Sequence, residues 1–178
     1  MTTHTPTSQQ DVKDPIGITG WHKEKGRDGE RTPMQWSTIA QSGFSPNSTT
    51  WLPIGSDYKT INVATESSDP NSLLRWNEAL IALRRNNPTL HDGGILMLDN
   101  TNPNVLSYVR TAPTGAHPIL ISLNMTAEPQ TIHLDLSSTN ITSTTIKPLL
   151  TNAPSLNTTT TFSGITLPPY TSFIAEIQ

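Results

Sequence analysis

Short apolar segments separated by turn-forming residues run through the second half of the chain and predict β-strands. In residues 130–136, Ile132, Leu134 and Leu136 alternate with polar residues, which is the pattern of a strand with one buried face. Similar segments span residues 95–99, 104–110, 118–124, 144–150, 159–166 and 171–178. Residues rich in Pro, Gly and Asn separate them and predict turns, for example at 99–104. Short strands at this regular spacing indicate an antiparallel sheet or a small β-sandwich.

A helical pattern ends the first half of the chain and predicts one amphipathic helix over residues 70–87. Asp69 is a suitable N-cap, Pro70 fits the first helical position, and Asn87-Pro88 ends the helix. Four apolar residues at helical spacing form one face: Leu73, Trp76, Leu80 and Leu83. A face this apolar needs a partner surface, so we expect association through it wherever it is left exposed.

Residues 11–68 show neither the helical nor the strand period, and Pro and Gly interrupt them throughout. They are predicted to form one long irregular loop, which cannot make a compact core alone. Charge changes along the chain as well, because residues 1–94 hold 19 of the 25 charged side chains. We therefore predict two domains of an α+β chain. Residues 1–91 contain the loop and the helix, and residues 92–178 form the antiparallel β-sandwich.

Composition excludes several classes of function. The formal charge of −3 gives no basic surface for nucleic acid, and no apolar run is long enough to cross a membrane. There is no cysteine, the five histidines are scattered, and the N-terminus lacks the pattern of a secretory signal. We expect no metal, no cofactor and no nucleic-acid or membrane partner, and a cytoplasmic location. Four Asn-x-Ser/Thr sequons, at Asn47, Asn124, Asn140 and Asn157, are chance matches in so Ser/Thr-rich a chain.

The most unusual segment is KGRDGERTPMQW, residues 25–36, which is too charged for a core and too rich in Gly and Pro for regular structure. By themselves Arg27, Asp28, Glu30 and Arg31 would be read as surface ion pairs of little energetic weight. The segment nevertheless belongs to a longer ordered set of motifs. These are DPIG at 14–17, KGRDGERTPMQW, SGF at 42–44, WLPI at 51–54, YKTINV at 58–63 and DPNSLLRWNEALIALRRNNPTL at 69–90.

That order of motifs resembles the C-terminal part of α-glucosidases of glycoside hydrolase family 13, close to oligo-1,6-glucosidases and trehalose synthases. The resemblance covers residues 11–178, and the loop segment is its most specific element. The sequence departs from the family pattern at Ser37, where the family usually has Asp, and at Gln41-Ser42, where Asn-Ala is common.

The resemblance implies that residues 1–91 are the end of a catalytic (β/α)8 barrel and that the β segment is the domain following it. It also implies an α-glucoside substrate such as maltose or isomaltose. The family's catalytic Asp, Glu and Asp precede the loop segment, and no Asn-His-Asp motif occurs here. We therefore expect no catalytic residue in this chain and no hydrolysis by it alone. Met1 ahead of residue 11 suggests a shortened reading frame or a split gene.

The resemblance also assigns roles to the charged residues of the loop. Arg27 matches the arginine that reaches the non-reducing-end glucose, with Arg31 as second choice, and Asp28 would hold the arginine in place. In the alternative interpretation, Arg31 and Asp28 brace the loop, and Lys25 would lie at its rim. An arginine offers five fixed donors to neighbouring sugar hydroxyls. Two alternatives stay open: a non-catalytic β-domain that binds carbohydrate or a partner protein, and the tail of a trehalose synthase or another transglycosylase.

Overall fold

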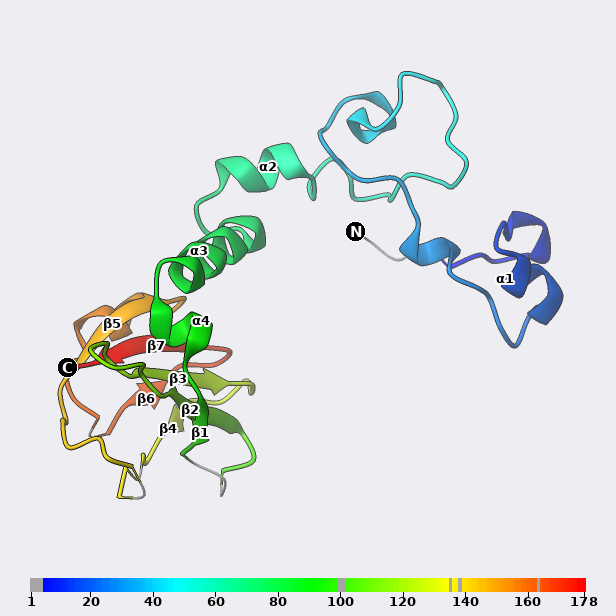
Figure 1. Cartoon of the computed structure of the whole chain (residues 1–178). Coiled ribbons are helices and arrows are strands. Elements are labelled where there is room, and N and C mark those ends of the chain that lie inside the picture. The colour runs from blue at the N-terminus through cyan, green and yellow to red at the C-terminus, as the bar shows by residue number, and fades with distance from the viewer. Residues whose placement is uncertain (1–4, 99–101, 135, 138, 163) are drawn as a thin grey trace. The chain divides into compact units, whose positions relative to one another are not determined.

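A computed structural model describes residues 5–98, 102–134, 136, 137, 139–162 and 164–178. The chain divides into two compact units, Met1–Glu78 and Ala79–Gln178, and the boundary falls inside helix α3 (Leu73–Arg85) (Figure 1). In the described part of the chain, no helix has the length and apolar character needed to cross a bilayer.

The N-terminal unit contains short helices that the sequence patterns did not predict. They are the α-helices α1 (Pro15–Gly20) and α2 (Val63–Ser68) and the 3-10 helices η1 (Gln9–Asp11), η2 (Asp28–Glu30) and η3 (Ala40–Gly43). Side-chain caps start both α-helices: Asp14 accepts from the Ile16 N–H, and Asn62 accepts from the Thr65 N–H at 2.9 Å. One or two turns are too short to carry a hydrophobic period, so the prediction of an irregular loop over 11–68 missed them.

This unit has almost no hydrophobic core, as the sequence predicted for so irregular a segment. Among its described residues, Val12 and Leu52 are the only buried aliphatic or aromatic side chains apart from Pro6 and Pro33. Nine large apolar side chains are exposed instead: Ile16, Ile18, Met34, Trp36, Ile39, Phe44, Trp51, Ile61 and Leu73. Polar contacts to the backbone hold the unit together, and its apolar surface is uncovered.

Helix α3 begins later than the capping signals indicated. The Asp69 carboxylate accepts from the Asn71 N–H at 2.8 Å, which makes a turn, and the helix starts after Ser72, whose hydroxyl accepts from the Arg75 N–H at 3.2 Å. Asp69 is therefore not its N-cap. At the other end, Asn87 caps a further helix, α4 (Pro88–Asp92), by accepting from the Thr89 N–H at 3.0 Å. The Asn-Pro pair stops one helix and starts the next.

The predicted apolar face of α3 is only partly used. Leu80 and Leu83 contact the buried cluster of Leu90, Ile119, Ile121 and Ile174 in the C-terminal unit. Trp76 on the same face is only half-buried, and Leu73 is 70% exposed. The N-terminal half of this face therefore stays uncovered.

An antiparallel five-stranded sheet forms the centre of the C-terminal unit. Its strands lie in the order β1 (Ile95–Met97), β2 (Val105–Arg110), β3 (Ile119–Asn124), β7 (Ser172–Ile177) and β5 (Ile146–Thr151). A second sheet consists of β4 (Gln130–Thr131) and β6 (Thr166–Leu167), and the 3-10 helix η4 spans Pro154–Thr158. The final strand, β7, lies between β3 and β5 and pairs with both, so it joins β1, β2 and β3 to the edge strand β5.

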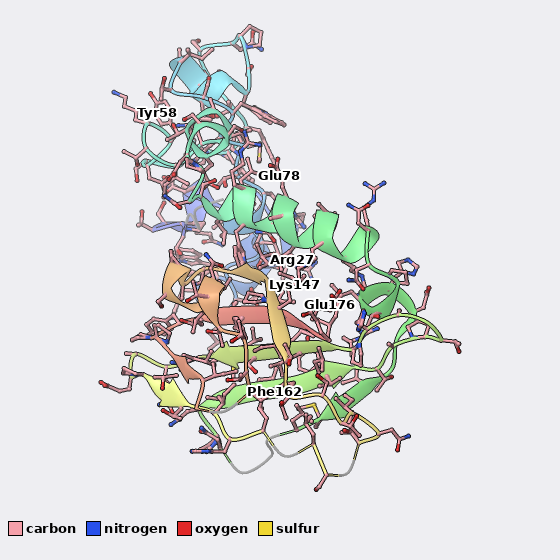
Figure 2. All side chains as sticks on the ribbon, turned by 90° about the vertical axis from the view of Figure 1, so that its left-hand side faces the viewer. Arg27, Tyr58, Glu78, Lys147, Phe162 and Glu176 are labelled. Atoms are coloured by element: carbon pink, nitrogen blue, oxygen red, sulfur yellow. The ribbon has the colours of Figure 1, made fainter. Side chains whose placement is uncertain are left out.

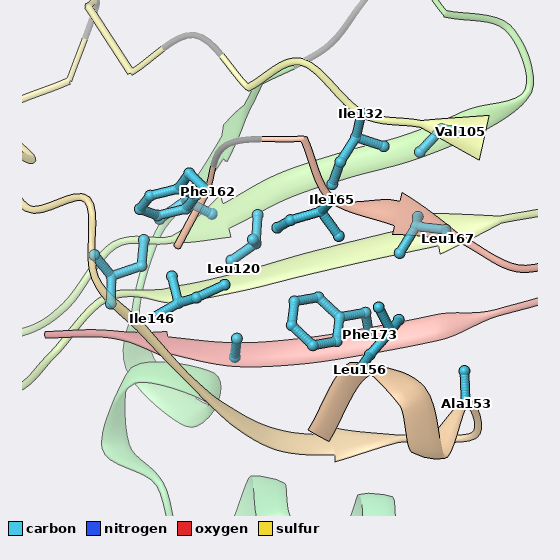
Figure 3. Packing of buried hydrophobic residues seen from close by; sticks show 13 residues of the cluster. Val105, Leu120, Ile132, Ile146, Ala153, Leu156, Phe162, Ile165, Leu167 and Phe173 are labelled. Atoms are coloured by element: carbon cyan, nitrogen blue, oxygen red, sulfur yellow. The ribbon is translucent and has the colours of Figure 1, made fainter. Parts of the chain in front are cut away.

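The two sheets enclose the main core. Ile132, Ile165 and Leu167 of the small sheet and its flanks point toward Leu120 and Phe173 of the large one (Figure 3). The opposite face of the large sheet carries Ile119, Ile121 and Ile174, which lie against Leu90 and the second half of α3. This arrangement confirms the predicted antiparallel β-domain.

Two predicted strands, over residues 130–136 and 159–166, pair over fewer residues than their apolar patterns indicated. Only Gln130 and Thr131 of the stretch 130–136 pair as a strand, yet Ile132 is fully buried and Leu134 contacts the core. The alternation of apolar residues therefore predicted which side chains are buried, but it did not predict how many residues pair with the neighbouring strand. The turn predicted at 99–104 and the polar position Asp135 fall partly outside the described residues.

Candidate functional site

The charged segment forms a short loop, residues 25–31, which we call the arginine loop; its Arg27 is labelled in Figure 2. Arg27 is exposed, and within the described part of the chain its guanidinium makes no hydrogen bond or ion pair. Its backbone, in contrast, is fixed, because the Arg27 N–H donates to Asp14 Oδ2 at 3.0 Å. The loop therefore presents a free guanidinium on a held backbone.

Asp14 is the centre of this arrangement, although it lies outside the charged segment. The residue is 2% exposed. Its Oδ1 accepts from the Ile16 N–H at 2.9 Å, while Oδ2 accepts from the Arg27 N–H and pairs with Arg31 Nη1 at 3.1 Å. Both oxygens are used, one inside helix α1 and the other on the arginine loop. Asp14 thus joins two segments that are 13 residues apart.

The Asp28 carboxylate makes the reciprocal connection. Asp28 is completely buried, and its Oδ2 accepts from the Lys13 N–H at 2.6 Å and from the Asp14 N–H at 3.2 Å. Its other oxygen, Oδ1, is buried and has no hydrogen-bond partner among the described residues. Each aspartate therefore binds the backbone of the other's segment, and we call this pair of contacts the aspartate clasp.

Two glycines allow the clasped segments to approach closely. Gly26 has a φ of +72°, and a Cβ on it would lie 2.7 Å from the Asp14 Cβ. A Cβ on Gly17 in α1 would collide with the Lys25 carbonyl and would lie 2.7 Å from Val12 Cγ1. Only residues without a side chain fit at these two points, so DPIG and KGRDGER form one local unit.

The structure brings the sequence-predicted site residues together in one loop, where Arg31 and Asp28 make bracing contacts. Arg31 pairs with Asp14, and Asp28 braces the loop through backbone amides; neither contacts Arg27 through its side chain. Lys25, expected at the rim, lies with its Nζ 5.6 Å from the centroid of the Trp21 ring. Sequence reasoning missed Asp14, although an Asp-Pro pair opening a helix is a usable capping signal.

A second set of contacts fixes the segment after the arginine loop. The Ser42 carbonyl accepts from the Trp36 N–H at 2.9 Å and from the Ser37 N–H at 3.0 Å. Gln41 and Ser42 both have positive φ, 53° and 51°, which is uncommon for residues with a Cβ. Gln41-Ser42, which departs from the family pattern, therefore forms a tight turn, and the Ser42 carbonyl in it holds the backbone of residues 36 and 37.

A groove lies beside this segment and away from the arginine loop. Its volume is about 280 Å³, and its lining is Met34, Gln35, Ile61, Asn62, Val63, Glu66, Leu73, Leu74 and Asn77. None of the predicted site residues lines it. The groove belongs to the uncovered apolar surface of the unit and not to the charged loop.

The clasp should be sensitive to acid. The pKa of Asp14 lies below its ordinary value of 3.8, chiefly because the Ile16 and Arg27 N–H groups donate to its carboxylate, and the charges of Arg31 and Arg27 add to this against burial. A depressed folded-state pKa contributes stability that is complete above about pH 4 and is lost as the pH falls through the folded-state value. We expect the exchange protection of the Arg27 amide, measured by NMR from pH 6 to pH 2, to fall below pH 4. Amides at the centre of β3 should keep theirs, and protection at Arg27 that is unchanged at pH 2 would contradict the expectation.

Two family models match the chain. The one described as alpha amylase, catalytic domain, matches residues 1–93, and the one described as maltogenic amylase, C-terminal domain, matches residues 95–174.

Relatives of known name agree with these matches. The chain is 36% identical over 127 residues to a probable alpha-glucosidase of Rhizobium meliloti, covering 71% of this chain and 22% of that protein. It is 31% identical over 156 residues to an oligo-1,6-glucosidase of Bacillus cereus, covering 86% of this chain and 26% of that protein. It is 36% identical over 124 residues to the trehalose synthase/amylase TreS of Mycobacterium tuberculosis, covering 65% and 21%. The chain thus spans about a quarter of the length of its relatives.

A solved structure has the same fold over the entire chain. It is a mutant of MutB in complex with glucose, with a TM-score of 0.81 and 26% sequence identity, and it covers 100% of this chain and 34% of that one.

Proposed function

Because the chain belongs to the α-amylase family, glycoside hydrolase family 13, we propose that it supplies the sugar-binding loop and the C-terminal β-domain of an α-glucosidase. Its fold is that of the tail of the family's barrel followed by a β-domain. The substrate would be an α-linked glucoside such as maltose or isomaltose. This assignment is supported by the named α-glucosidase and oligo-1,6-glucosidase relatives.

The observation that carries the proposal is the free guanidinium of Arg27 on a clasped backbone. Five N–H donors in a fixed plane suit the vicinal hydroxyls of a pyranose, and the held backbone lowers the entropy lost on binding. Arg31 is drawn into an ion pair with Asp14 at 3.1 Å, which leaves Arg27 as the donor for a sugar. Glucose bound in the MutB structure is consistent with this choice of ligand class.

Catalysis would depend on carboxylates outside residues 1–178. A retaining glycosidase needs a nucleophile and an acid/base about 5 Å apart across the scissile bond. The two buried carboxylates of the loop region, Asp14 and Asp28, are instead bound to backbone amides. The nine exposed apolar side chains of the N-terminal unit are the surface that the rest of the catalytic domain would cover. We expect residues 1–178 alone to release no glucose from maltose.

A trehalose synthase-like isomerase is the second candidate, favoured by the 36% identity to TreS. Such an enzyme would use the same arginine to bind sugar and would differ in whether water or a sugar accepts the glucosyl group. Product analysis distinguishes the two, because a hydrolase yields glucose and the synthase yields trehalose from maltose.

The role of Arg27 can be tested in a chimera in which residues 1–178 replace the matching quarter of the Bacillus cereus oligo-1,6-glucosidase. Removing two charge-assisted hydrogen bonds should lower kcat/KM for an α-glucoside by about 10²–10³. We therefore expect this loss for Arg27→Ala, and a smaller loss for Arg27→Lys, which keeps the charge without the planar fork.

Arg85→Ala, at an exposed arginine in the last turn of α3, is the matched control and should change kcat/KM by less than about threefold. If the Arg27→Ala chimera were as active as this control, Arg27 would not be a sugar-binding residue.

A further inference from the structure

We infer that Asp14 is the positioning residue of the arginine loop, and that the aspartate clasp needs a carboxylate at position 14 but only an acceptor at position 28. The inference rests on the proposed function solely for the identity of what Arg27 binds. The clasp itself is defined by the contacts of this chain.

The charge at position 14 follows from the number of donors that its carboxylate takes. Three N–H groups approach its two oxygens: Ile16 N at 2.9 Å on Oδ1, and Arg27 N at 3.0 Å with Arg31 Nη1 at 3.1 Å on Oδ2. An asparagine has one acceptor oxygen and a donor NH2 in place of the other. In Asp14→Asn, the NH2 group must therefore face either the Ile16 N–H or the Arg27 N–H and Arg31, and the hydrogen bonds on that side are lost.

Position 28 differs because one carboxylate oxygen accepts both hydrogen bonds. Asp28 Oδ2 accepts from both Lys13 N and Asp14 N, while the buried Oδ1 has no partner within the described residues. In Asp28→Asn the side-chain oxygen can keep both backbone donors, and the NH2 replaces the unpartnered oxygen. Removal of an uncompensated buried charge offsets the loss of charge assistance. The amide should therefore be tolerated.

Asp14 affects Arg27 by two routes. It holds the Arg27 backbone directly through the N–H, next to Gly26, whose φ of +72° sets the direction of the loop. It also engages the Arg31 guanidinium, so that of the two arginines in the loop only Arg27 is left without a carboxylate partner in the described part of the chain. Without the Asp14 carboxylate, the Arg27 backbone loses its hydrogen bond. Arg31 then loses its ion pair, so both arginines of the loop would be without a carboxylate partner.

The test uses the full 178-residue chain in four forms: unmodified, Asp14→Asn, Asp28→Asn and Glu30→Gln. Glu30 is exposed in the same loop, so Glu30→Gln controls for the loss of one negative charge. The first readout is the hydrogen-exchange rate of the Arg27 amide by NMR. The second is the chemical-shift change of the Arg27 amide and Nε–H signals on titration with methyl α-D-glucoside.

We expect Asp14→Asn to raise the exchange rate of the Arg27 amide by at least about tenfold, since a hydrogen bond to a charged group is lost. Asp28→Asn and Glu30→Gln should stay within about threefold of the unmodified chain. A rate for Asp14→Asn equal to that of Glu30→Gln, or an unprotected Arg27 amide in the unmodified chain, would overturn the positioning role. An effect of Asp28→Asn as large as that of Asp14→Asn would overturn the asymmetry and would point to a hydroxyl or water that donates to Asp28 Oδ1.

The sugar titration separates this inference from the proposed function. If the unmodified chain responds to the glucoside, Asp14→Asn should weaken the response at least tenfold. The Trp36 and Ser37 amides, which donate to the Ser42 carbonyl in the same unit, should keep their protection, which unfolding of the N-terminal unit would not allow. If no form responds while the exchange pattern is as expected, the clasp stands and the sugar assignment for this loop fails.

Discussion

Cutting the chain before the N-cap Ser72 should give one fragment that unfolds cooperatively and one that shows no cooperative transition. Proline aside, residues 72–178 contain 17 of the 19 buried aliphatic and aromatic side chains of the described chain, and both faces of the large sheet are covered within this fragment. It should unfold cooperatively, with a calorimetric enthalpy of about 60–80 kcal/mol. Residues 1–71 keep only Val12 and Leu52 of that set and should show no transition.

Scanning calorimetry and far-UV circular dichroism of the two fragments and the intact chain provide the measurement. Amide exchange in the fragment of residues 1–71 should find protection limited to amides bound by the aspartate clasp and by the Ser42 carbonyl. A heat-absorption peak from that fragment comparable with that of residues 72–178 would show that polar contacts suffice for cooperative folding, against this expectation.

Asn124→Asp should destabilise the C-terminal unit by at least about 3 kcal/mol. The Asn124 side chain is 3% exposed, and its Nδ2 donates to the carbonyls of Glu128 at 2.8 Å, Pro168 at 2.8 Å and Leu167 at 3.2 Å. Its Oδ1 accepts from the N–H and the hydroxyl of Thr126. An aspartate at this position would point an oxygen at three carbonyl oxygens and would bury a carboxylate.

Urea denaturation of residues 72–178, monitored by far-UV circular dichroism, gives the free energy of unfolding. Asn157→Asp is the matched control, because Asn157 begins the same kind of sequon but is exposed, and its effect should stay within about 0.5 kcal/mol. Equal stabilities for the two variants would contradict the role of Asn124. The same burial shows that the Asn124 sequon is inaccessible in the folded chain, whereas Asn47, Asn140 and Asn157 are exposed.

Sequence patterns located the main elements of the fold because their signals are local. Alternating apolar residues marked the strands, and the spacing of Leu80 and Leu83 marked the one long helix. Where elements are short, the signal fails: the two-residue strand β4 and the six-residue helix α1 are fixed by pairing and by capping. Only the start of α3 was misplaced by a competing local signal, since the side chain of Asp69 makes a turn instead of a cap.

The amino-acid sequence by itself determined that residues 25–31 form a charged loop, that an antiparallel β-domain follows, and, through its motifs, the family of enzymes to which the chain belongs. Only the tertiary structure decided which charges are available. Asp14 binds the backbone of Arg27 and the side chain of Arg31, and Asp28 is buried against Lys13 and Asp14. Of the two arginines in the loop, Arg27 is the one without a carboxylate partner among the described residues. The reason is that a hydrogen bond between residues 14 and 27 depends on how the backbone turns at Gly17 and Gly26, and no periodic pattern along the chain records such an approach in space.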